Sequence, residues 1–367
     1  MRAIIAGGGT GGHIYPGLAI AAAIEEHYSQ AEIIFLGSAD GLEADIVPEA
    51  GYRLEVIPCQ GLPREVSLKI LQSILLSSVG FCQALKKVFS FKPDLVIGTG
   101  GYVSGPTILA AVLLRKKTII HEQNAYPGLT NRLLASKVDK VALSNRAASH
   151  HFSDQADLVW TGNPVRPEIL TARKEEACLE LGLELEKPKL LAFGGSSGAR
   201  SINQAMEALY PLAEEGQLQI IHITGHQDFE RVKEVAQQLG ITELERGDTI
   251  IKSYLHNMAA ALAAADLVVC RAGATALAEI TARGIPAILI PYPHAAENHQ
   301  EHNARSLKKE GAAEVILDEE LTGQKLASKV KELIFTEKKL ASMAEASKKL
   351  GKPQALENIL EILKELL

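Results

Sequence analysis

The chain has 367 residues, of which 47% are hydrophobic and 22% charged, and its formal net charge is −6. This length is comfortable for two domains, the composition is ordinary for a globular protein, and the acidic balance argues against a nucleic-acid binder. Four scattered cysteines without a CxxC pair disfavour a zinc ribbon or a thioredoxin-type site and suit a reducing compartment. We find no signal-peptide pattern and no uninterrupted apolar run of about 18 residues that would span a membrane.

The first predicted element is a short apolar strand, Ala3–Ala6, which leads into the glycine-rich segment Gly7–His13 and then a helical stretch, Leu18–Glu26. Glycine lets the backbone approach a ligand closely, and the free amide groups at the start of a helix favour an anion. We therefore predict a phosphate-binding loop. His13 closes this loop and is a candidate general base, with capping or bracing of the loop as the alternative role.

The same glycines fit the GxGxxG pattern of dinucleotide sites, which is a weak signal by itself. Such sites place an acid at the end of the second strand to hold a ribose. Here the second strand, Glu32–Leu36, is followed by Asp40 and Glu43 as the nearest acids. A nicotinamide-dependent dehydrogenase that uses Gly7–Gly12 stays open as an alternative, as does a tight turn that binds nothing.

Polar and glycine-rich segments follow two further strands of the first half. Gly98–Pro106 follows the strand Leu95–Ile97, and His121–Asn124 follows the strand Thr118–Ile120. Ligands bind at the carboxyl ends of parallel strands, so two glycine loops at one edge suit a diphosphate. A purely structural role for the polar run stays open. A last strand is predicted at Lys140–Leu143.

The helical stretch Leu68–Phe89 is apolar over more than one face. Between Ser67 and Thr118 the only acid is Asp94, against the bases Lys69, Lys86, Lys87, Lys92, Arg115, Lys116 and Lys117. An apolar surface beside unbalanced bases indicates reversible docking on anionic lipid, here through Leu68–Phe89 and Arg115–Lys117. An ordinary buried helix with solvated lysines is the alternative.

The second half repeats the plan of the first. The strand Lys189–Phe193 leads into the glycine loop Gly194–Arg200 and the helix Ser201–Leu209. Alternating strands and helices continue to the end of the chain, with strands Gln219–Thr224, Leu267–Cys270 and Ala287–Ile290 and helices Phe229–Leu239, Ala274–Arg283 and Ser328–Leu350. This alternation predicts two doubly wound α/β domains, with Thr161–Pro167 as linker and a phosphorylated ligand in the cleft between them.

Glu279 lies about a turn and a half into the helix that follows Arg271–Gly273. A carboxylate there can accept two hydrogen bonds from a ribose diol, although a solvent-facing side chain is the alternative. A nearby cluster lacks zinc-site spacing and no Asp-x-Asp motif is present, so we expect no metal: His294, Glu297, His299, Glu301 and His302. Arg166 and helix amino termini could neutralise phosphate instead.

In combination, these motifs resemble those of the MurG family, within glycosyltransferase family 28. Members add N-acetylglucosamine to the undecaprenyl-diphosphate-linked muramyl-pentapeptide, lipid I, and so make lipid II for peptidoglycan. The resemblance covers nearly the whole chain. It rests on seven motifs in order, namely Gly7–His13, Gly98–Pro106, His121–Asn124, Gly162–Arg166, Gly194–Arg200, Arg271–Glu279 and Asn298–Gln300.

The resemblance implies the GT-B fold, two Rossmann-like doubly wound parallel-sheet domains that face a central cleft. Residues 1–163 would form the acceptor-binding, membrane-associating domain, with the last helix, 353–367, packed back on it. Residues 164–352 would form the domain that binds the UDP-sugar. The family is metal-independent and inverting, so no cofactor is expected.

The resemblance also assigns site residues. His13 is the favoured base, and Gly9, Gly101, Tyr102 and His121 would receive the acceptor diphosphate. The UDP-sugar would contact Thr10, Gly11, Gly12, Asn124, Arg166, Ser196, Leu255, Ala274, Thr275, Ala276, Leu277, Ala278, Glu279 and Gln300. Within this set Arg166 and Ser196 would contact phosphate, Leu255 uracil and Glu279 the ribose. Ala276 departs from the threonine of many relatives, so a hydroxyl contact is missing there or is replaced by Thr275.

The expected mechanism is a single displacement, in which the acceptor hydroxyl attacks the anomeric carbon from the face opposite UDP and His13 accepts its proton. The rival on the same fold is a UDP-N-acetylglucosamine 2-epimerase, which needs no lipid surface. The implied partners are UDP-N-acetylglucosamine, lipid I and an anionic membrane, with cell-wall synthesis proteins as further candidates. The implied location is the cytoplasmic face of the bacterial cell membrane.

Overall fold

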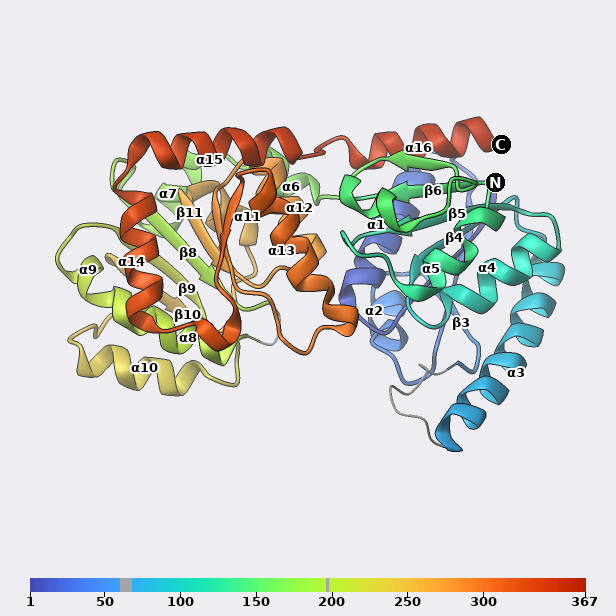
Figure 1. The fold of residues 1–367 in the computed structure, drawn as a ribbon, viewed down its shortest axis with the longest axis horizontal. Helices are drawn as coiled ribbons and strands as arrows, with labels where there is room; N and C mark the ends of the chain where they lie inside the picture. The colour runs from blue at the N-terminus through green and yellow to red at the C-terminus, as the bar shows by residue number, and fades with distance from the viewer. Residues whose placement is uncertain (60–67, 196–197) are drawn as a thin grey trace. The chain divides into compact units, whose positions relative to one another are not determined.

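The structure is a computed structural model that describes residues 1–59, 68–195 and 198–367, with side chains described from residue 76 onward in the helix that begins at Leu68. The chain divides into two compact units, the first of residues 1–164 and 354–367 and the second of residues 165–353 (Figure 1). Each boundary lies one residue beyond the one expected from the sequence. The first falls inside the segment 161–167, where two prolines interrupt regular structure.

The first unit is built on a parallel sheet of seven strands within the described residues, in the order β3-β2-β1-β4-β5-β6-β7. Its two central strands, β1 and β4, are almost entirely buried, which explains why they read as continuous apolar runs. The strands are β1 (Arg2–Gly7), β2 (Glu32–Gly37), β3 (Arg53–Val56), β4 (Leu95–Gly100), β5 (Lys117–Glu122), β6 (Lys140–Leu143) and β7 (Leu158–Trp160).

Helices cover this sheet, and the last helix of the chain returns to it (Figure 1). That helix, α16 (Ala355–Leu366), packs against α1 and buries Ile359, Ile362 and Leu363 in the same core cluster as Ile20. The Asn358 side-chain amide donates to the Thr161 carbonyl at 3.0 Å. The other helices are α1 (Gly11–His27), α2 (Glu43–Glu49), α3 (Leu68–Phe91), α4 (Ser104–Leu113) and α5 (Leu129–Leu134), with 3-10 turns at Ala135–Lys137 and Arg146–His151.

The second unit has a parallel sheet of six strands within the described residues, in the order β10-β9-β8-β11-β12-β13. Two buried apolar clusters form its core, one of which contains the alanine-rich helix α11. The strands are β8 (Lys189–Phe193), β9 (Gln219–Ile223), β10 (Thr249–Lys252), β11 (Leu267–Cys270), β12 (Ala287–Leu289) and β13 (Ala313–Val315).

The helices of this second unit connect its parallel strands and extend beyond the last one. They are α6 (Pro167–Thr171), α7 (Lys174–Leu181), α8 (Arg200–Met206), α9 (Tyr210–Glu214), α10 (Phe229–Gln238), α11 (Met258–Ala264), α12 (Ala274–Arg283), α13 (His299–Lys309), α14 (Gly323–Ile334) and α15 (Glu337–Leu350). Short 3-10 turns occur at Glu207–Leu209, Ala296–Asn298 and Asp318–Glu320.

The observed elements differ from the sequence prediction at the edges of the two sheets and at α1, which begins at Gly11 inside the predicted loop Gly7–His13 and not at Leu18. Four short strands were not predicted: β3, β7, β10 and β13 lie at the ends of their sheets and have three or four residues each. The helix predicted over Ser328–Leu350 is two helices, α14 and α15, with a non-helical backbone at Thr336 between them. Their apolar periodicity continues across the break, so the pattern alone does not show it.

Candidate active site

Two glycine loops of the first unit meet where the neighbouring strands β1 and β4 end. The Gly8 amide donates to the Gly100 carbonyl at 3.3 Å. Gly101 adopts a positive φ of 81°, and a Cβ atom there would lie 2.2 Å from the Gly8 carbonyl oxygen. The loops therefore pack backbone against backbone, which only glycine permits at Gly101. Gly9 and Thr10 lie exposed on the first loop, and Tyr102, 60% exposed, lies on the second.

A buried carboxylate holds the first glycine loop in place through a hydrogen bond. Glu43, 1% exposed, accepts hydrogen bonds from the Gly9 amide at 2.9 Å and from the Ser38 amide and hydroxyl at 2.9 and 2.6 Å. Burial alone would raise the pKa of Glu43, but these hydrogen bonds outweigh it and hold the pKa below its usual value. Glu43 thus shapes the loop, and the dehydrogenase alternative loses one of the two acids it had for a ribose.

His13 is held against the second loop. Its Nδ1 atom lies 3.1 Å from Oε1 of Gln123, and the Thr99 hydroxyl donates to its carbonyl at 2.8 Å. A Cβ atom on Gly100 would lie 2.5 Å from Nδ1, so the ring occupies the space that glycine leaves. No side chain caps the start of α1, so His13 is not a capping residue. Gly11 and Gly12, in the same first turn, are half-buried.

The polar run after β5 faces inward. His121 is 0% exposed, and burial lowers the pKa of its ring to about 4. Its Nε2 atom lies 3.2 Å from the Gly162 carbonyl oxygen, and its Nδ1 atom lies 3.0 Å from Nε2 of Gln123. A neutral, enclosed imidazole is unsuited to hold a diphosphate, so His121 is not among the proposed acceptor contacts.

Glu122 organises the loop that carries Asn124. Its buried carboxylate accepts hydrogen bonds from the Asn124 amide at 2.9 Å, the Gly128 amide at 3.1 Å and the Asn131 side chain at 2.7 Å. The Asn124 side chain donates to the same carboxylate at 3.2 Å. Glu122 therefore fixes where Asn124, a predicted sugar contact, sits beyond the end of β5.

The second unit has its own glycine loop, between β8 and α8. Gly198 has a positive φ of 76°, and a Cβ atom there would lie 2.2 Å from the Thr224 carbonyl oxygen at the end of β9. As in the first unit, the loop passes too close to a neighbouring backbone for any side chain. Ser196, the predicted phosphate contact on this loop, lies outside the described residues.

Arg166 and Glu279 are bonded to each other. Nε of Arg166 donates to Oε1 of Glu279 at 2.9 Å, and Nη1 of Arg166 lies 3.8 Å from Glu168. Glu279 is 6% exposed, so it does not face solvent. Burial raises the pKa of Glu279, while the Arg166 guanidinium opposes the rise and favours the charged form. Two residues predicted to hold different parts of one ligand therefore form one cluster.

The remaining predicted donor contacts lie in α12, on the loop that carries Leu255, and in the first turn of α13. Ala274, Thr275 and Ala276 are half-buried, and no side chain caps the first turn of the helix. Leu277 and Ala278 belong to or pack on the core, which leaves mainly their backbone for a ligand. Leu255 also packs on this core, and Oε1 of Gln300 accepts from the Tyr292 amide at 3.0 Å.

Other polar groups of the second unit have structural partners. Within the described residues, no three His, Cys, Asp or Glu side chains gather as metal ligands do. In the cluster noted in the sequence, Glu301 accepts from Asn298 at 2.6 Å and pairs with Arg305. Arg271 pairs with Asp318 and donates to the Ser201 hydroxyl at 3.0 Å, which ties the end of β11 to the start of α8.

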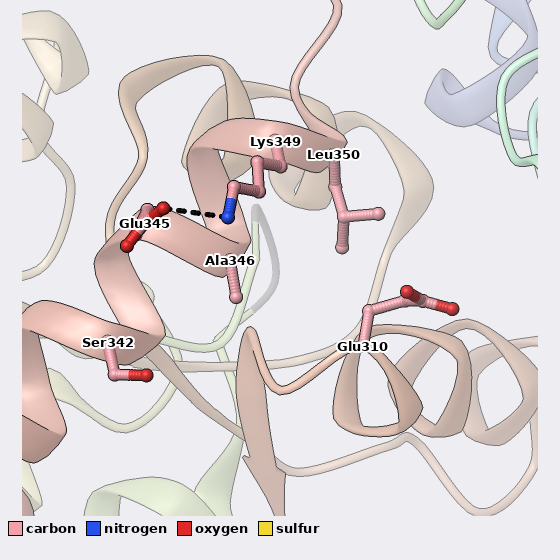
Figure 2. Close-up of a pocket in the computed structure, with 6 residues that line it drawn as sticks. All are labelled: Glu310, Ser342, Glu345, Ala346, Lys349 and Leu350. Carbon is pink, nitrogen blue, oxygen red and sulfur yellow. Dashed lines mark ion pairs between the residues drawn. The ribbon is translucent and has the colours of Figure 1, made fainter.

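A shallow surface pocket beside α15 contains none of the predicted site residues. Figure 2 shows its lining by Glu310, Ser342, Glu345, Ala346, Lys349 and Leu350. Within it, Glu345 and Lys349 form an ion pair at 2.7 Å, one helical turn apart. The predicted site residues lie outside this pocket, on segments near the carboxyl ends of the strands in the two sheets.

Gln123 and Thr99 lie in segments that the sequence marks as candidate sites but without a role of their own, and Ser144 lies outside those segments; all three surround the two histidines of the first unit. Each follows or ends a strand at the carboxyl edge of the sheet. That position is a usable signal, because ligand-binding side chains concentrate there. The hydrogen bonds that give these residues a role join strands and loops far apart in the chain.

Comparison with known proteins places this geometry in a family. Residues 3–143 match the glycosyltransferase family 28 N-terminal domain, and residues 189–359 match the glycosyltransferase family 28 C-terminal domain. A relative from Halothermothrix orenii, named UDP-N-acetylglucosamine--N-acetylmuramyl-(pentapeptide) pyrophosphoryl-undecaprenol N-acetylglucosamine transferase, is 50% identical over 100% of this chain and 99% of its own.

Solved structures agree. The crystal structure of Acinetobacter baumannii MurG is 26% identical, with a TM-score of 0.79 and 99% of both chains covered. A putative UDP-N-acetylglucosamine 2-epimerase from Listeria monocytogenes is 16% identical, with a TM-score of 0.66 and coverage of 99% of this chain and 96% of its own, which shows the shared fold alone. With two Rossmann-like parallel-sheet domains and full-length relatives of this identity, the chain belongs to glycosyltransferase family 28.

Proposed function

We propose that the protein transfers N-acetylglucosamine from UDP-N-acetylglucosamine to undecaprenyl-diphosphate-linked muramyl-pentapeptide, lipid I, to give lipid II. The observation that carries this proposal is the 50% identity, over the full chain, to a relative named as that transferase. The glycine loops at the carboxyl edges of the two parallel sheets, two on the first unit and one on the second, supply the anion-binding chemistry that both diphosphate substrates need.

The donor would bind to the second unit. The ribose diol donates to Glu279, whose carboxylate Arg166 orients, and the amides at the start of α12 and the glycine loop after β8 bind the diphosphate. Ser196 and Arg166 contact phosphate, and the backbone near Leu255 reads the base. Thr10, Gly11, Gly12, Asn124 and Gln300 remain predicted contacts to the donor. The hydroxyl contact that Ala276 cannot make is either absent or supplied by Thr275.

The acceptor diphosphate would bind to the glycine loops of the first unit, at Gly9, Gly101 and Tyr102. The acceptor hydroxyl attacks the anomeric carbon, its proton passes to His13, and the bond from that carbon to the UDP oxygen breaks with the electron pair remaining on UDP. Attack from the opposite face inverts the configuration. Arg166 and the helix amides stabilise the charge that develops on UDP.

The 2-epimerase alternative draws on the same fold and the same nucleotide-sugar. Its structural representative is only 16% identical to this chain, whereas the transferase relatives reach 50%. The two reactions also differ in the sites that they require. An epimerase uses no acceptor, whereas a transferase uses separate anion-binding loops for donor and acceptor, and a UDP-sugar alone would leave the acceptor loops empty. The transferase is therefore the favoured function.

Sugar transfer tests the proposal directly. Radiolabelled UDP-N-acetylglucosamine is incubated with the protein and a lipid I analogue, and the label is followed into the lipid product. We expect transfer that depends on the acceptor and falls roughly 10²- to 10⁴-fold in His13→Ala, with donor binding retained. Formation of an epimerised UDP-sugar without acceptor, and no labelled lipid, would show that the alternative is correct.

We further propose that the protein associates peripherally with an anionic membrane through α3. Within the described residues, no helix combines the length and apolar character that a membrane span requires. Val79, in the middle of α3, is exposed, as is Phe89 near its carboxyl end. Two of the bases predicted to attract lipid are already paired, however: Lys87 with Glu55, and Lys117 with Asp139 at 3.8 Å.

The topology of the first unit separates the two ends of α3. A helix that joins parallel strands runs back against them, so the carboxyl ends of α3 and α4, with Lys86, Arg115 and Lys116, lie at the edge opposite the glycine loops. The six residues of β4 correspond to about 20 Å. The acceptor diphosphate lies at the membrane surface, so we place the membrane contact toward the amino-terminal end of α3. In Figure 1 this end extends past α4.

A further inference from the structure

A buried chain of hydrogen bonds runs from the Gly162 carbonyl to the ring of His13. Its members are His121, which ends in β5, and Gln123, two residues further on. Both side chains are buried, His121 completely and Gln123 almost so. The chain begins at a carbonyl group, which can only accept, so the position of each proton along it follows step by step.

The first step concerns His121. Its Nε2 atom lies 3.2 Å from the Gly162 carbonyl oxygen, so Nε2 carries the proton and donates; the Ser144 hydroxyl, also at 3.2 Å, shares it. Burial lowers the pKa of His121 to about 4, so the ring is neutral near pH 7. A neutral imidazole carries one ring proton. Nδ1 of His121 therefore presents a lone pair toward Gln123.

The second step fixes the orientation of the Gln123 amide. Its Nε2 atom lies 2.8 Å from the Thr99 carbonyl oxygen, 3.1 Å from the His121 carbonyl oxygen and 3.0 Å from Nδ1 of His121. All three partners are acceptors. The reversed amide would place Oε1 against two carbonyl oxygens and a lone pair, with no donor among them. The Gln123 amide nitrogen therefore faces this group, and Oε1 faces His13.

The third step reaches His13. Oε1 of Gln123 accepts, so Nδ1 of His13 donates across the 3.1 Å that joins them. With the single proton of the neutral ring on Nδ1, the lone pair is on Nε2. We propose that Gln123, oriented by His121 and the Thr99 carbonyl, is a positioning residue that holds His13 in the tautomer whose Nε2 can accept a proton. This inference rests on the proposed function, in which His13 is the base.

The surroundings of the ring support this assignment. The Thr99 hydroxyl donates to the His13 carbonyl oxygen at 2.8 Å. Because Gly100 has no side chain, the His13 ring can lie next to the Gly100 backbone. Thr99 of β4 therefore fixes the backbone of His13, and Gln123, which follows β5, fixes Nδ1 of its ring. A histidine side chain in water favours the other tautomer, with the proton on Nε2, so the acceptor on Gln123 makes a difference that can be measured.

Nitrogen NMR of the protein labelled with ¹⁵N-histidine reads this tautomer without any substrate. We expect His13, identified by its loss in His13→Ala, to show a protonated Nδ1 and an unprotonated Nε2. In Gln123→Met the acceptor is gone, so the signal should shift toward the Nε2-protonated form. In Gln123→Glu the oxygen that replaces Nε2 needs a proton to donate to the acceptors of Thr99 and His121; in that protonated form the other oxygen still accepts from Nδ1, so the original tautomer should persist. A wild-type spectrum with Nε2 protonated would overturn the proposal.

Turnover provides the second readout. We expect kcat to fall on the order of 10- to 100-fold in Gln123→Met, as for the hydrogen-bond partners of other functional histidines, with KM for UDP-N-acetylglucosamine unchanged. Gln219→Met, at an equally buried glutamine in the second unit, is the matched control for loss of a buried amide and should leave the His13 signal unchanged. Equal shifts of this signal in both variants would also overturn the proposal.

The two measurements separate this inference from the proposed function. If the NMR spectra behave as expected but His13→Ala retains normal turnover, the tautomer assignment stands and His13 is not the base. If transfer occurs and depends on His13, but Gln123→Met leaves its tautomer unchanged, the function stands and the positioning role of Gln123 fails.

Discussion

At the scale of single residues, the candidate site is held by polar side chains that face inward. Glu43 fixes the Gly9 amide, Glu122 fixes Asn124, and Gln123 fixes His13. Each is buried, and each accepts a hydrogen bond from the residue that it positions. A buried polar group is costly unless it is bonded, so these contacts form together with the fold and pre-organise the loops before any ligand arrives.

Glu279 offers a test of the donor site at this scale. Its replacement by alanine removes a charged acceptor from the proposed ribose contact, and a hydrogen bond to a charged group contributes about 1.5–3 kcal/mol. We expect the affinity for UDP-N-acetylglucosamine, measured by calorimetry, to fall roughly 10- to 100-fold. Glu168→Ala is the control, since Glu168 is exposed and also lies near Arg166. An unchanged dissociation constant in Glu279→Ala would refute the ribose assignment.

Gly101 tests the close approach of the two loops. Gly101→Ala adds backbone strain at a positive φ and a Cβ atom 2.2 Å from the Gly8 carbonyl oxygen. Gly51→Ala is the matched control, because Gly51 has a φ of 86° with open space around its Cβ position. We expect Gly51→Ala to cost about 1–2 kcal/mol of stability through strain alone, without loss of turnover. Gly101→Ala should cost more and weaken acceptor use; equal effects would disprove the collision.

At the scale of elements, the last helix completes the first unit. The helix α16 starts after the second unit ends, yet Ile359, Ile362 and Leu363 belong to the core cluster beneath α1. The sequence shows the apolar stripe of α16, but it does not show which surface this stripe covers. The helix covers part of the face where α1 packs, which stabilises the element that carries His13.

Ile362 tests this role of α16. Ile362→Ala removes a buried side chain and leaves a cavity, so we expect the free energy of unfolding of the first unit to fall by about 2–5 kcal/mol. Leu367→Ala, at the exposed end of the same helix, is the control and should change stability by less than about 0.5 kcal/mol. Urea unfolding followed by hydrogen exchange in α1 provides the measurement. Similar stability of both variants would mean that α16 contributes little to this core.

At the scale of the whole molecule, a net charge of −6 has to be reconciled with an anionic membrane surface. The local excess of bases in the chain segment 67–118 is smaller in the structure than in the sequence, because Glu55 and Asp139 pair with Lys87 and Lys117. Electrostatic attraction near an anionic surface contributes about 1 kcal/mol per base. The pairing of Lys87 and Lys117 with acids therefore weakens the attraction that the sequence leads us to expect. Apolar contact near the glycine loops therefore has the larger share in the proposed docking.

Vesicle sedimentation compares an exposed apolar residue in the middle of α3 with the bases at the carboxyl ends of α3 and α4. Val79→Glu places a charge on the exposed side of α3, so we expect binding to phosphatidylglycerol vesicles to fall several-fold, while transfer to a short-tailed, water-soluble acceptor is retained. The triple variant Lys86→Gln, Arg115→Gln and Lys116→Gln should weaken binding less, and only at low salt. If the triple variant alone abolishes sedimentation, the membrane contacts the opposite edge of the sheet and our placement is wrong.

The sequence by itself determined the alternation of strands and helices, the three glycine loops, the linker and the motifs of the family resemblance, because each is a local pattern of a few neighbouring residues. Only the tertiary structure decided which side chains meet. His13 and Gln123 are 110 positions apart, and Arg166 and Glu279 are 113 positions apart. Their pairing depends on which strands lie next to one another and on which side chains become buried there. The physical reason is that a local pattern determines the direction of the backbone but not its distant neighbours. The packing of the sheet decides which distant segment lies beside a buried polar group and supplies its hydrogen-bond partner.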